Sequence, residues 1–91
     1  MAKVTIDQRA FEVTVDGMPV PQLTVIEFRI LATLAGQIGR VVSRGSILSD
    51  ALGVSPGLNT RTVDMHVSRL RAKLGAEVIE SKYGKGYRLS A

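Results

Sequence analysis

Asn-Thr-Arg-Thr-Val-Asp-Met-His-Val-Ser-Arg-Leu-Arg-Ala-Lys-Leu-Gly (59–75) is the most informative segment of this 91-residue chain. At about 100° per residue, its branched apolar side chains fall on one side of a helix, and its basic and hydroxyl side chains fall on the other. Asn59 or Thr60 is placed to cap the first turn, and Gly75 suits a left-handed residue after the last turn. An amphipathic helix over 60–74 is therefore predicted, with a buried stripe formed by Val63, Val67, Leu70 and Leu74.

A glycine-punctuated segment follows directly, Val-Ile-Glu-Ser-Lys-Tyr-Gly-Lys-Gly-Tyr-Arg-Leu (78–89), and it predicts a β-hairpin. The first 23 residues also predict short strands, because 4–6 and 11–15 alternate apolar and polar residues. Asp16-Gly17 is a strong signal for a tight hairpin turn. Pro19 and Pro21 limit the next strand to an edge or a short piece. We expect this N-terminal sheet to be a scaffold without ligands.

Two further helices are predicted between the sheet and the 60–74 helix. Thr24 and Glu27 have the spacing of a capping box, and apolar residues follow at helical intervals. Ser43 is expected to cap the next helix. The resulting order, β-β-β-α-(β)-α-α-β-β, belongs to the α+β class, with helices over 25–35 and 44–52, a short strand at 41–42 and a loop at 53–57.

Composition restricts the function classes. The net charge of +4 favours an anionic partner, for which nucleic acid and an anionic membrane surface both qualify. The absence of cysteine excludes disulfides and thiolate metal sites. No apolar run is long enough to cross a bilayer, and no signal peptide is evident, so a cytoplasmic location is expected. The 60–74 helix, with one buried face and one face of Arg, Ser, Thr and His, has the chemistry needed to lie in a DNA major groove.

Four blocks of sequence, taken in their order and spacing, indicate a family. They are Leu23-Thr24-x-x-Glu27-Phe28-x-x-Leu31, Gly39-Arg40-Val41-Val42-Ser43-Arg44, Arg61-Thr62-Val63-Asp64-x-His66-Val67-x-x-Leu70-Arg71-x-Lys73-Leu74, and Lys82-Tyr83-Gly84-Lys85-Gly86-Tyr87-Arg88-Leu89. Together they resemble the C-terminal winged-helix effector domain of OmpR/PhoB-type response regulators over nearly the whole chain. The resemblance implies one winged helix-turn-helix domain over 1–91, with a four-stranded antiparallel sheet within 1–23, a three-helix bundle at 24–75 and a hairpin wing at 76–91.

The resemblance also implies a function. Members of this family bind double-stranded promoter DNA sequence-specifically as transcriptional regulators, and many contact RNA polymerase through the loop before the recognition helix. A receiver domain that carries the phosphorylated aspartate precedes the effector domain, and this chain does not contain one. We therefore expect the output domain of a two-component system, monomeric when isolated and paired on tandem half-sites. We expect no catalytic residues, cofactor, metal or membrane partner.

Candidate DNA-binding residues lie on the recognition helix, 60–74, in the major groove, and on the wing, 81–87, at the adjacent backbone or minor groove. Arginine donates to phosphates or bidentately to guanine, short hydroxyls approach backbone or base edges, and Met65 is suited to a thymine methyl. The candidates are Thr60, Arg61, Thr62, Met65, His66, Ser68, Arg69, Arg71, Lys73, Ser81, Lys82, Tyr83, Lys85 and Tyr87.

Several of these positions keep two interpretations. His66 matches a family position at the DNA backbone, but it also suits a half-buried residue that bridges helix and wing. Tyr87 is placed to give its hydroxyl to a phosphate or to pack its ring against the helix, and Arg71 lies nearer the buried edge of the helix. Asp64 would be repelled by phosphate, so we interpret it as a partner of the helix dipole and of Arg61.

The sequence departs from the family pattern in three places. Tyr83 stands where the family commonly has an arginine that enters the minor groove, and a tyrosine cannot supply the charge of that contact. Gly45-Ser46 replaces residues that are usually acidic, which predicts a weak first turn in the second helix. The loop at 53–58 lacks the tryptophan common near the end of the second helix, which leaves a polymerase contact there without support from the residues.

Three rival classes of protein remain. A basic protein–protein interaction module that docks an acidic partner would use the same helix, but it would be indifferent to DNA sequence. An RNA-binding domain would need more exposed aromatic residues than this chain offers. An enzyme is disfavoured because His66 is the only histidine, and the only Gly-x-Gly lies in a hairpin rather than before a helix.

Overall fold

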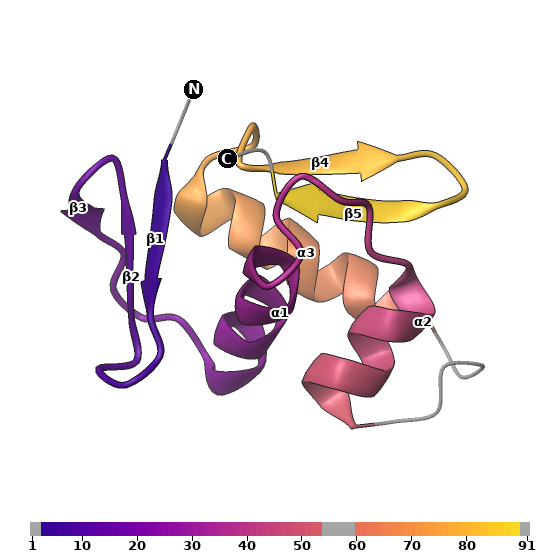
Figure 1. Ribbon diagram of the computed structural model, residues 1–91, viewed down its shortest axis with the longest axis horizontal. Helices are drawn as coiled ribbons and strands as arrows, with labels where there is room; N and C mark the ends of the chain where they lie inside the picture. Colours follow the sequence, from indigo (N-terminus) through magenta and orange to yellow (C-terminus); the bar gives the residue numbers. More distant parts are fainter. Residues whose placement is uncertain (1–2, 54–59, 90–91) are drawn as a thin grey trace.

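A computed structural model describes residues 3–53 and 60–89 of the chain. An N-terminal antiparallel sheet lies at one end of the molecule, the helices occupy the middle, and a C-terminal hairpin lies along the last helix (Figure 1). The elements are β1 (Val4–Asp7), β2 (Glu12–Val15), β3 (Met18–Pro19), α1 (Val25–Ala35), α2 (Arg44–Ile47), the π-helical turn η1 (Leu48–Leu52), α3 (Arg61–Leu74), β4 (Ile79–Lys82) and β5 (Gly86–Leu89). This α+β architecture confirms the predicted fold class.

The N-terminal sheet has the order β1-β2-β3, and Val4 pairs with Val15. Asp16 and Gly17 both have positive φ, 52° and 82°, as the predicted hairpin turn requires. The described residues hold three strands in this sheet, so the four strands implied by the family resemblance are not found. The prediction of a strand from residue 11 was also wrong. Phe11 has a φ of 56° and stacks its ring on Phe28, with 4.1 Å between the ring centroids.

Helix α1 has the predicted bounds, because its capping box forms as the sequence indicated. Thr24 Oγ1 accepts from the Glu27 amide at 3.1 Å, and Glu27 Oε1 accepts from the Thr24 amide at 2.9 Å. Ser43 caps α2 by accepting from the amide of Ser46 at 3.1 Å, and the helix forms despite Gly45. One capping prediction failed: the Thr60 side chain makes no cap hydrogen bond to α3. The alternative cap, Asn59, and the proposed polymerase-contacting loop over 54–58 lie outside the described residues.

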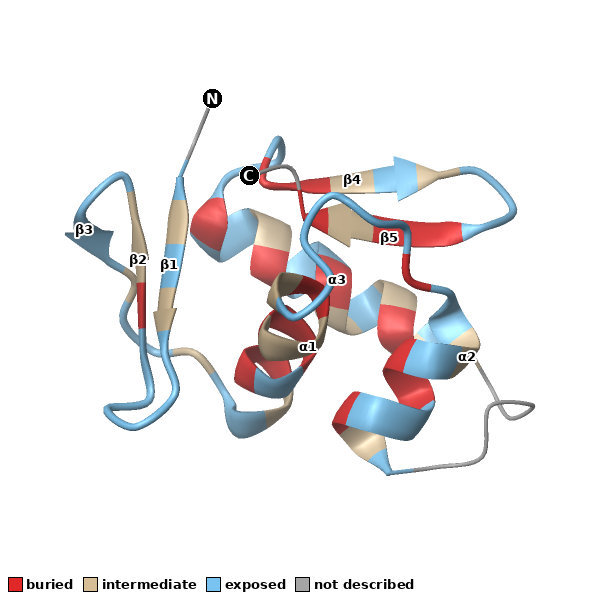
Figure 2. Cartoon of the chain, viewed as in Figure 1, coloured by how far each residue is buried: buried red, intermediate tan, exposed pale blue. Residues whose placement is uncertain are grey.

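The hydrophobic core lies between the helices and the inner face of the hairpin, where buried residues from α1, α3, β4 and β5 face one another (Figure 2). All four residues of the predicted α3 stripe are buried. The hairpin is joined to the rest of the domain by a bridge between Tyr87 and Val42, with N···O distances of 3.0 and 2.7 Å. The short strand predicted at 41–42 is present only as this isolated bridge at Val42. The bridge and the core together fix the hairpin beside α3.

Candidate nucleic-acid interface

The outward face of α3 carries exposed polar and basic side chains opposite its buried stripe. Arg61, Ser68 and Arg69 are exposed, and Met65 is 49% exposed. Thr62 and His66 are half-buried, as are Thr60 before the helix and Asp64 within it. The helix therefore presents the residue types that recognise DNA backbone and base edges along one surface.

The hairpin places a second group of polar residues beside this surface. Ser81, Tyr83 and Lys85 are exposed, and the Tyr83 side chain projects fully into solvent at 103% relative exposure. Lys82 is half-buried, and its ammonium lies 3.5 Å from Glu80 Oε2. Arg88 also binds Glu80 at 2.6 Å, and this hydrogen bond lowers the pKa of the Glu80 carboxyl. The hairpin turn is thus a solvent-exposed tip that carries two lysines and an aromatic ring.

Arg71 is turned toward the hairpin rather than outward. Its Nε and Nη2 donate to the carbonyl oxygen of Ile79 at 3.0 and 2.8 Å, and Nη2 also donates to Ser81 Oγ at 2.6 Å. The guanidinium carbon lies 5.5 Å from the centroid of the Tyr87 ring, within the range of a cation–π contact. Arg71 therefore joins the hairpin to α3, and these bonds favour a structural role over the predicted phosphate contact.

Tyr87 and Asp64 join three elements. The Tyr87 hydroxyl donates to Asp64 Oδ1 at 2.5 Å, and Arg44 Nε at the start of α2 lies 2.9 Å from the same oxygen. Burial, reinforced by the Asp64 carboxylate, raises the pKa of the Tyr87 hydroxyl. Tyr87 is buried, which favours the packing interpretation over the proposed phosphate contact. Asp64 takes partners from α2 and β5, an arrangement that spacing within α3 did not predict.

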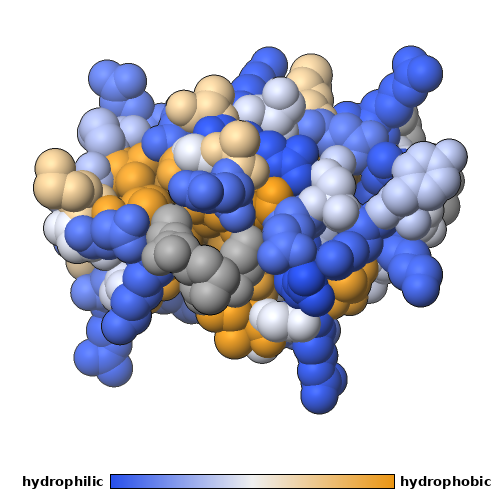
Figure 3. Space-filling model, turned by 90° about the horizontal axis from the view of Figure 1, so that it is seen from above, coloured by the Kyte–Doolittle hydropathy of each residue, from blue (hydrophilic) through white to orange (hydrophobic). Residues whose placement is uncertain are grey.

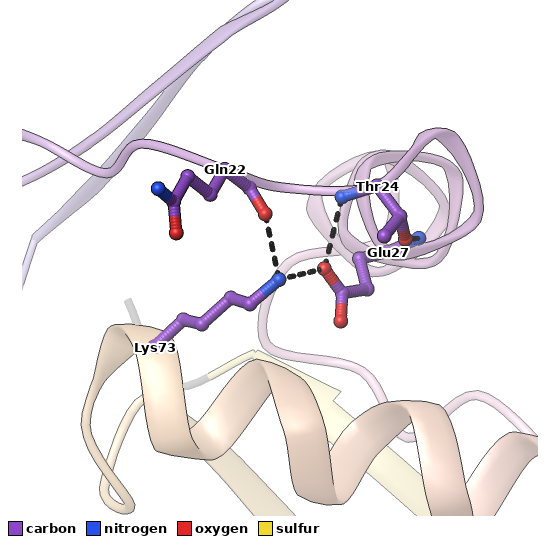
Figure 4. A network of polar contacts seen from close by, with 4 residues as sticks. All are labelled: Gln22, Thr24, Glu27 and Lys73. Atoms are coloured by element: carbon purple, nitrogen blue, oxygen red, sulfur yellow. Dashed lines mark hydrogen bonds and ion pairs between the residues drawn. The ribbon is translucent and has the colours of Figure 1, made fainter.

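Lys73 binds residues at the start of α1, which favours a structural role over the predicted DNA contact. Its ammonium binds Glu27 Oε1 at 2.6 Å and donates to the carbonyl oxygen of Gln22 at 2.7 Å (Figure 4). The Glu27 side chain is 1% exposed. Burial alone would raise the Glu27 pKa, but hydrogen bonds from Lys73 and Thr24 lower it below its usual value. The cation of Lys73 is therefore committed to the α1–α3 contact.

His66 is half-buried, as one of its two interpretations expected. Its Nδ1 is buried and has no hydrogen-bond partner among the described residues. The described residues contain no group of three or more His, Asp or Glu that could hold a metal ion. Among the same residues, no helix combines the length and the apolar character needed to cross a membrane.

Residues that the sequence did not single out as candidates complete the surface. A cleft, here called the α2–wing cleft, is lined by Ser43, Arg44, Thr60 and the hairpin residues 81–87. Arg44 and Ser43 both belong to one of the family blocks, and Ser43 was also predicted to be a helix cap. The signal for both was their place in that block, but their approach to the hairpin depends on the tertiary fold.

The bundle of helices, with its last helix exposing basic residues beside a β-hairpin, defines a winged-helix domain. Residues 19–89 match the family model described as "Transcriptional regulatory protein, C terminal". The chain belongs to this family of winged-helix domains, and the resemblance to OmpR/PhoB-type effector domains is confirmed.

Known relatives are similar over nearly the whole chain. The transcriptional regulatory protein CseB of Streptomyces avermitilis is 39% identical over 89 residues, which cover 98% of this chain and 37% of CseB. VxrB of Vibrio cholerae is 40% identical over 90 residues, which cover 99% of this chain and 36% of VxrB. The RstA DNA-binding domain of Klebsiella pneumoniae, solved in complex with the RstA box, superposes with a TM-score of 0.83 at 32% identity, covering 96% of this chain and 90% of that one. The chain thus spans little more than a third of the length of these two curated relatives.

Proposed function

We propose that this domain binds double-stranded promoter DNA sequence-specifically and is the output domain of a two-component response regulator. The observation that carries the proposal is the polar and basic face of α3 lying beside the lysine-bearing wing tip. A helix of this kind fits the major groove, while the wing reaches the adjacent backbone or minor groove. The RstA domain, which shares the fold, was solved bound to its DNA box.

The partners follow from the same proposal. The length of the relatives supports a receiver domain that acts together with this one, and a cytoplasmic location suits a transcriptional regulator. We expect the isolated domain to be a monomer, with two copies on half-sites about one helical turn apart, because that spacing places both recognition helices on one DNA face. RNA polymerase stays a predicted partner through the loop before α3.

Binding is expected to depend strongly on salt. Arg61, Arg69, Lys82 and Lys85 are the candidate phosphate or base contacts that lie exposed or half-buried on α3 and the wing. If about four cations meet phosphates, log K falls against log salt with a slope of about −3.6, or roughly 100-fold between about 50 and 200 mM. Fluorescence anisotropy on a duplex selected from a random pool measures this slope.

A variant of the recognition helix, its matched control and the DNA selection distinguish the rival functions. Arg69→Ala is expected to weaken binding by about 1–3 kcal/mol if the arginine reads a base. Arg9→Ala removes an equivalent exposed charge from the turn after β1 and is expected to leave binding nearly unchanged. A basic module that docks an acidic protein would instead yield no enriched sequence in the selection, and equal affinity for all duplexes would refute specific readout.

The wing is expected to add affinity without much base preference. A narrow A·T-rich minor groove attracts arginine through its focused negative potential, and Tyr83 offers no such charge. Tyr83→Ala should therefore change binding little, Lys85→Ala should weaken it about equally on all sequences, and Tyr83→Arg should raise affinity most beside an A·T-rich flank. Binding to one core site with A·T-rich and G·C-rich flanks tests this. A wild-type preference for A·T flanks that Tyr83→Ala abolishes would show that Tyr83 itself reads the groove.

A further inference from the structure

The α2–wing cleft lies between the two parts of the candidate interface. Its walls come from the start of α2, the residue before α3, and both strands and the turn of the wing. In the ribbon, the wing turn and the start of α2 lie at the same end of the molecule (Figure 1). Its volume is about 330 Å³, which is far more than a single water molecule needs. That space accommodates a phosphate group and part of its hydration shell.

The lining of the cleft suits an anion. Arg44, Lys82 and Lys85 contribute cations, Ser43, Thr60 and Ser81 contribute hydroxyls, and none of the described lining residues is acidic. Seen from above, the surface at the right-hand end of the molecule, where Figure 1 places the wing turn, is mainly hydrophilic (Figure 3). Phosphate oxygens in DNA commonly accept from this combination of guanidinium, ammonium and hydroxyl donors.

Arg44 is held in a defined orientation at this cleft. Its Nε lies 2.9 Å from Asp64 Oδ1, and the Arg44 side chain remains 49% exposed. The Tyr87 hydroxyl binds the same carboxylate oxygen at 2.5 Å, so the position of Asp64 is fixed from the wing as well. Arg44 also hydrogen-bonds with the Tyr87 hydroxyl. A guanidinium has five N–H donors in a planar fork, so Arg44 still presents donors to a further partner in one direction.

The position of the cleft agrees with the path of a DNA strand. If α3 lies in the major groove and the wing at the adjacent minor groove, the strand between these grooves passes between α3 and the wing. We propose that the α2–wing cleft binds one backbone phosphate of this strand, with Arg44 as the principal contact and Asp64 as the residue that positions it. This inference rests on the proposed function and adds a residue outside α3 and the wing to the binding surface.

Single-phosphate neutralisation tests the inference. In a duplex selected from a random pool, each phosphate near the half-site is replaced in turn by an uncharged methylphosphonate. For the wild-type domain, we expect that replacing one particular phosphate lowers the affinity roughly tenfold, equivalent to about 1.4 kcal/mol. In Arg44→Gln, the same replacement should cost less than about twofold, while the costs at other positions stay as in the wild type. The slope of log K against log salt should also fall by about 1.

Three further variants separate positioning from folding. Asp64→Asn should reduce the cost of neutralising that one phosphate, because Arg44 loses its anchor, although the charge of Arg44 is retained. Tyr87→Phe keeps the Arg44–Asp64 pair and should keep most of that cost. Arg9→Gln is the matched charge control and should keep the wild-type profile.

Thermal unfolding identifies any variant that does not fold. If Arg44→Gln does not fold, Arg44→Lys replaces it, and neutralising the same phosphate should then lower affinity less than in the wild type.

The outcomes are distinguishable. If the wild type shows no sequence-selected DNA binding, the proposed function fails, and the phosphate site fails with it. If the wild type binds but Arg44→Gln, or Arg44→Lys in its place, keeps the full wild-type methylphosphonate profile, the phosphate site alone is overturned. If Asp64→Asn keeps the full cost at the Arg44-dependent position, the positioning role of Asp64 is overturned.

Discussion

Replacing Lys73 with methionine is expected to lower the free energy of unfolding by about 3 kcal/mol, because it leaves the buried Glu27 carboxylate without its counter-ion. The Glu27 side chain is 1% exposed, and the Lys73 ammonium lies 2.6 Å from its Oε1. Lys73 itself is 31% exposed, so we place the effect at the lower end for a broken buried pair. For a domain of this size the melting temperature should fall by on the order of 15 °C.

Two companion variants show whether the effect comes from the unpaired charge. Glu27→Gln combined with Lys73→Met removes both charges and keeps an acceptor for the Thr24 amide, so the double variant should be more stable than Lys73→Met alone. Lys82→Met breaks the exposed contact to Glu80 and should have little effect. Equal melting temperatures for Lys73→Met and Lys82→Met would contradict the assignment of Lys73 to a buried pair.

The same ion pair makes stability depend on acid. The folded-state pKa of Glu27 is lowered from 4.5, so its ionised form stabilises the fold above the unfolded-state value. That contribution is lost as the pH falls from about 4.5 through the folded-state pKa. Denaturation measured between about pH 6 and 2 should show this loss in the wild type and a shallower one in Glu27→Gln.

Replacing Gly86 with alanine is expected to destabilise the domain by about 3 kcal/mol or more. A Cβ atom built at Gly86 would lie 2.0 Å from the carbonyl oxygen of Val42 and 2.9 Å from the Cα of Ser43. The φ of Gly86 is 145°, a conformation that residues with a side chain rarely adopt. The added methyl would separate the wing from the chain before α2, because backbone atoms cannot move aside as a flexible side chain does.

Gly84→Ala is the matched control in the same hairpin. Gly84 also has a positive φ, 70°, but an added Cβ would meet nothing within 4 Å. Its cost should be about 1 kcal/mol, from the left-handed conformation alone. Urea denaturation of both variants measures the difference, and a Gly86→Ala protein as stable as Gly84→Ala would contradict the close approach of β5 to Val42.

Local features of the sequence predicted the secondary structure well. The capping box at Thr24 and Glu27 predicted α1, the Ser43 cap predicted the start of α2, and the apolar periodicity predicted which face of α3 is buried. These patterns act within three or four residues, so they can be recognised without knowing the fold. The conformation of Phe11 was not predicted in this way. Its ring packs on Phe28 and its φ is positive, and the alternation of apolar and polar residues indicates neither feature.

Local sequence patterns were enough to predict the α+β class, the amphipathic recognition helix and the set of basic residues from which a DNA surface is built. Which of these cations bind within the fold depends on tertiary packing. Lys73 binds a carboxylate 46 positions away, and Arg71 binds the hairpin backbone 8 positions away. Long, flexible basic side chains take partners from whichever element folds beside them, so their roles depend on packing between segments that no local pattern describes.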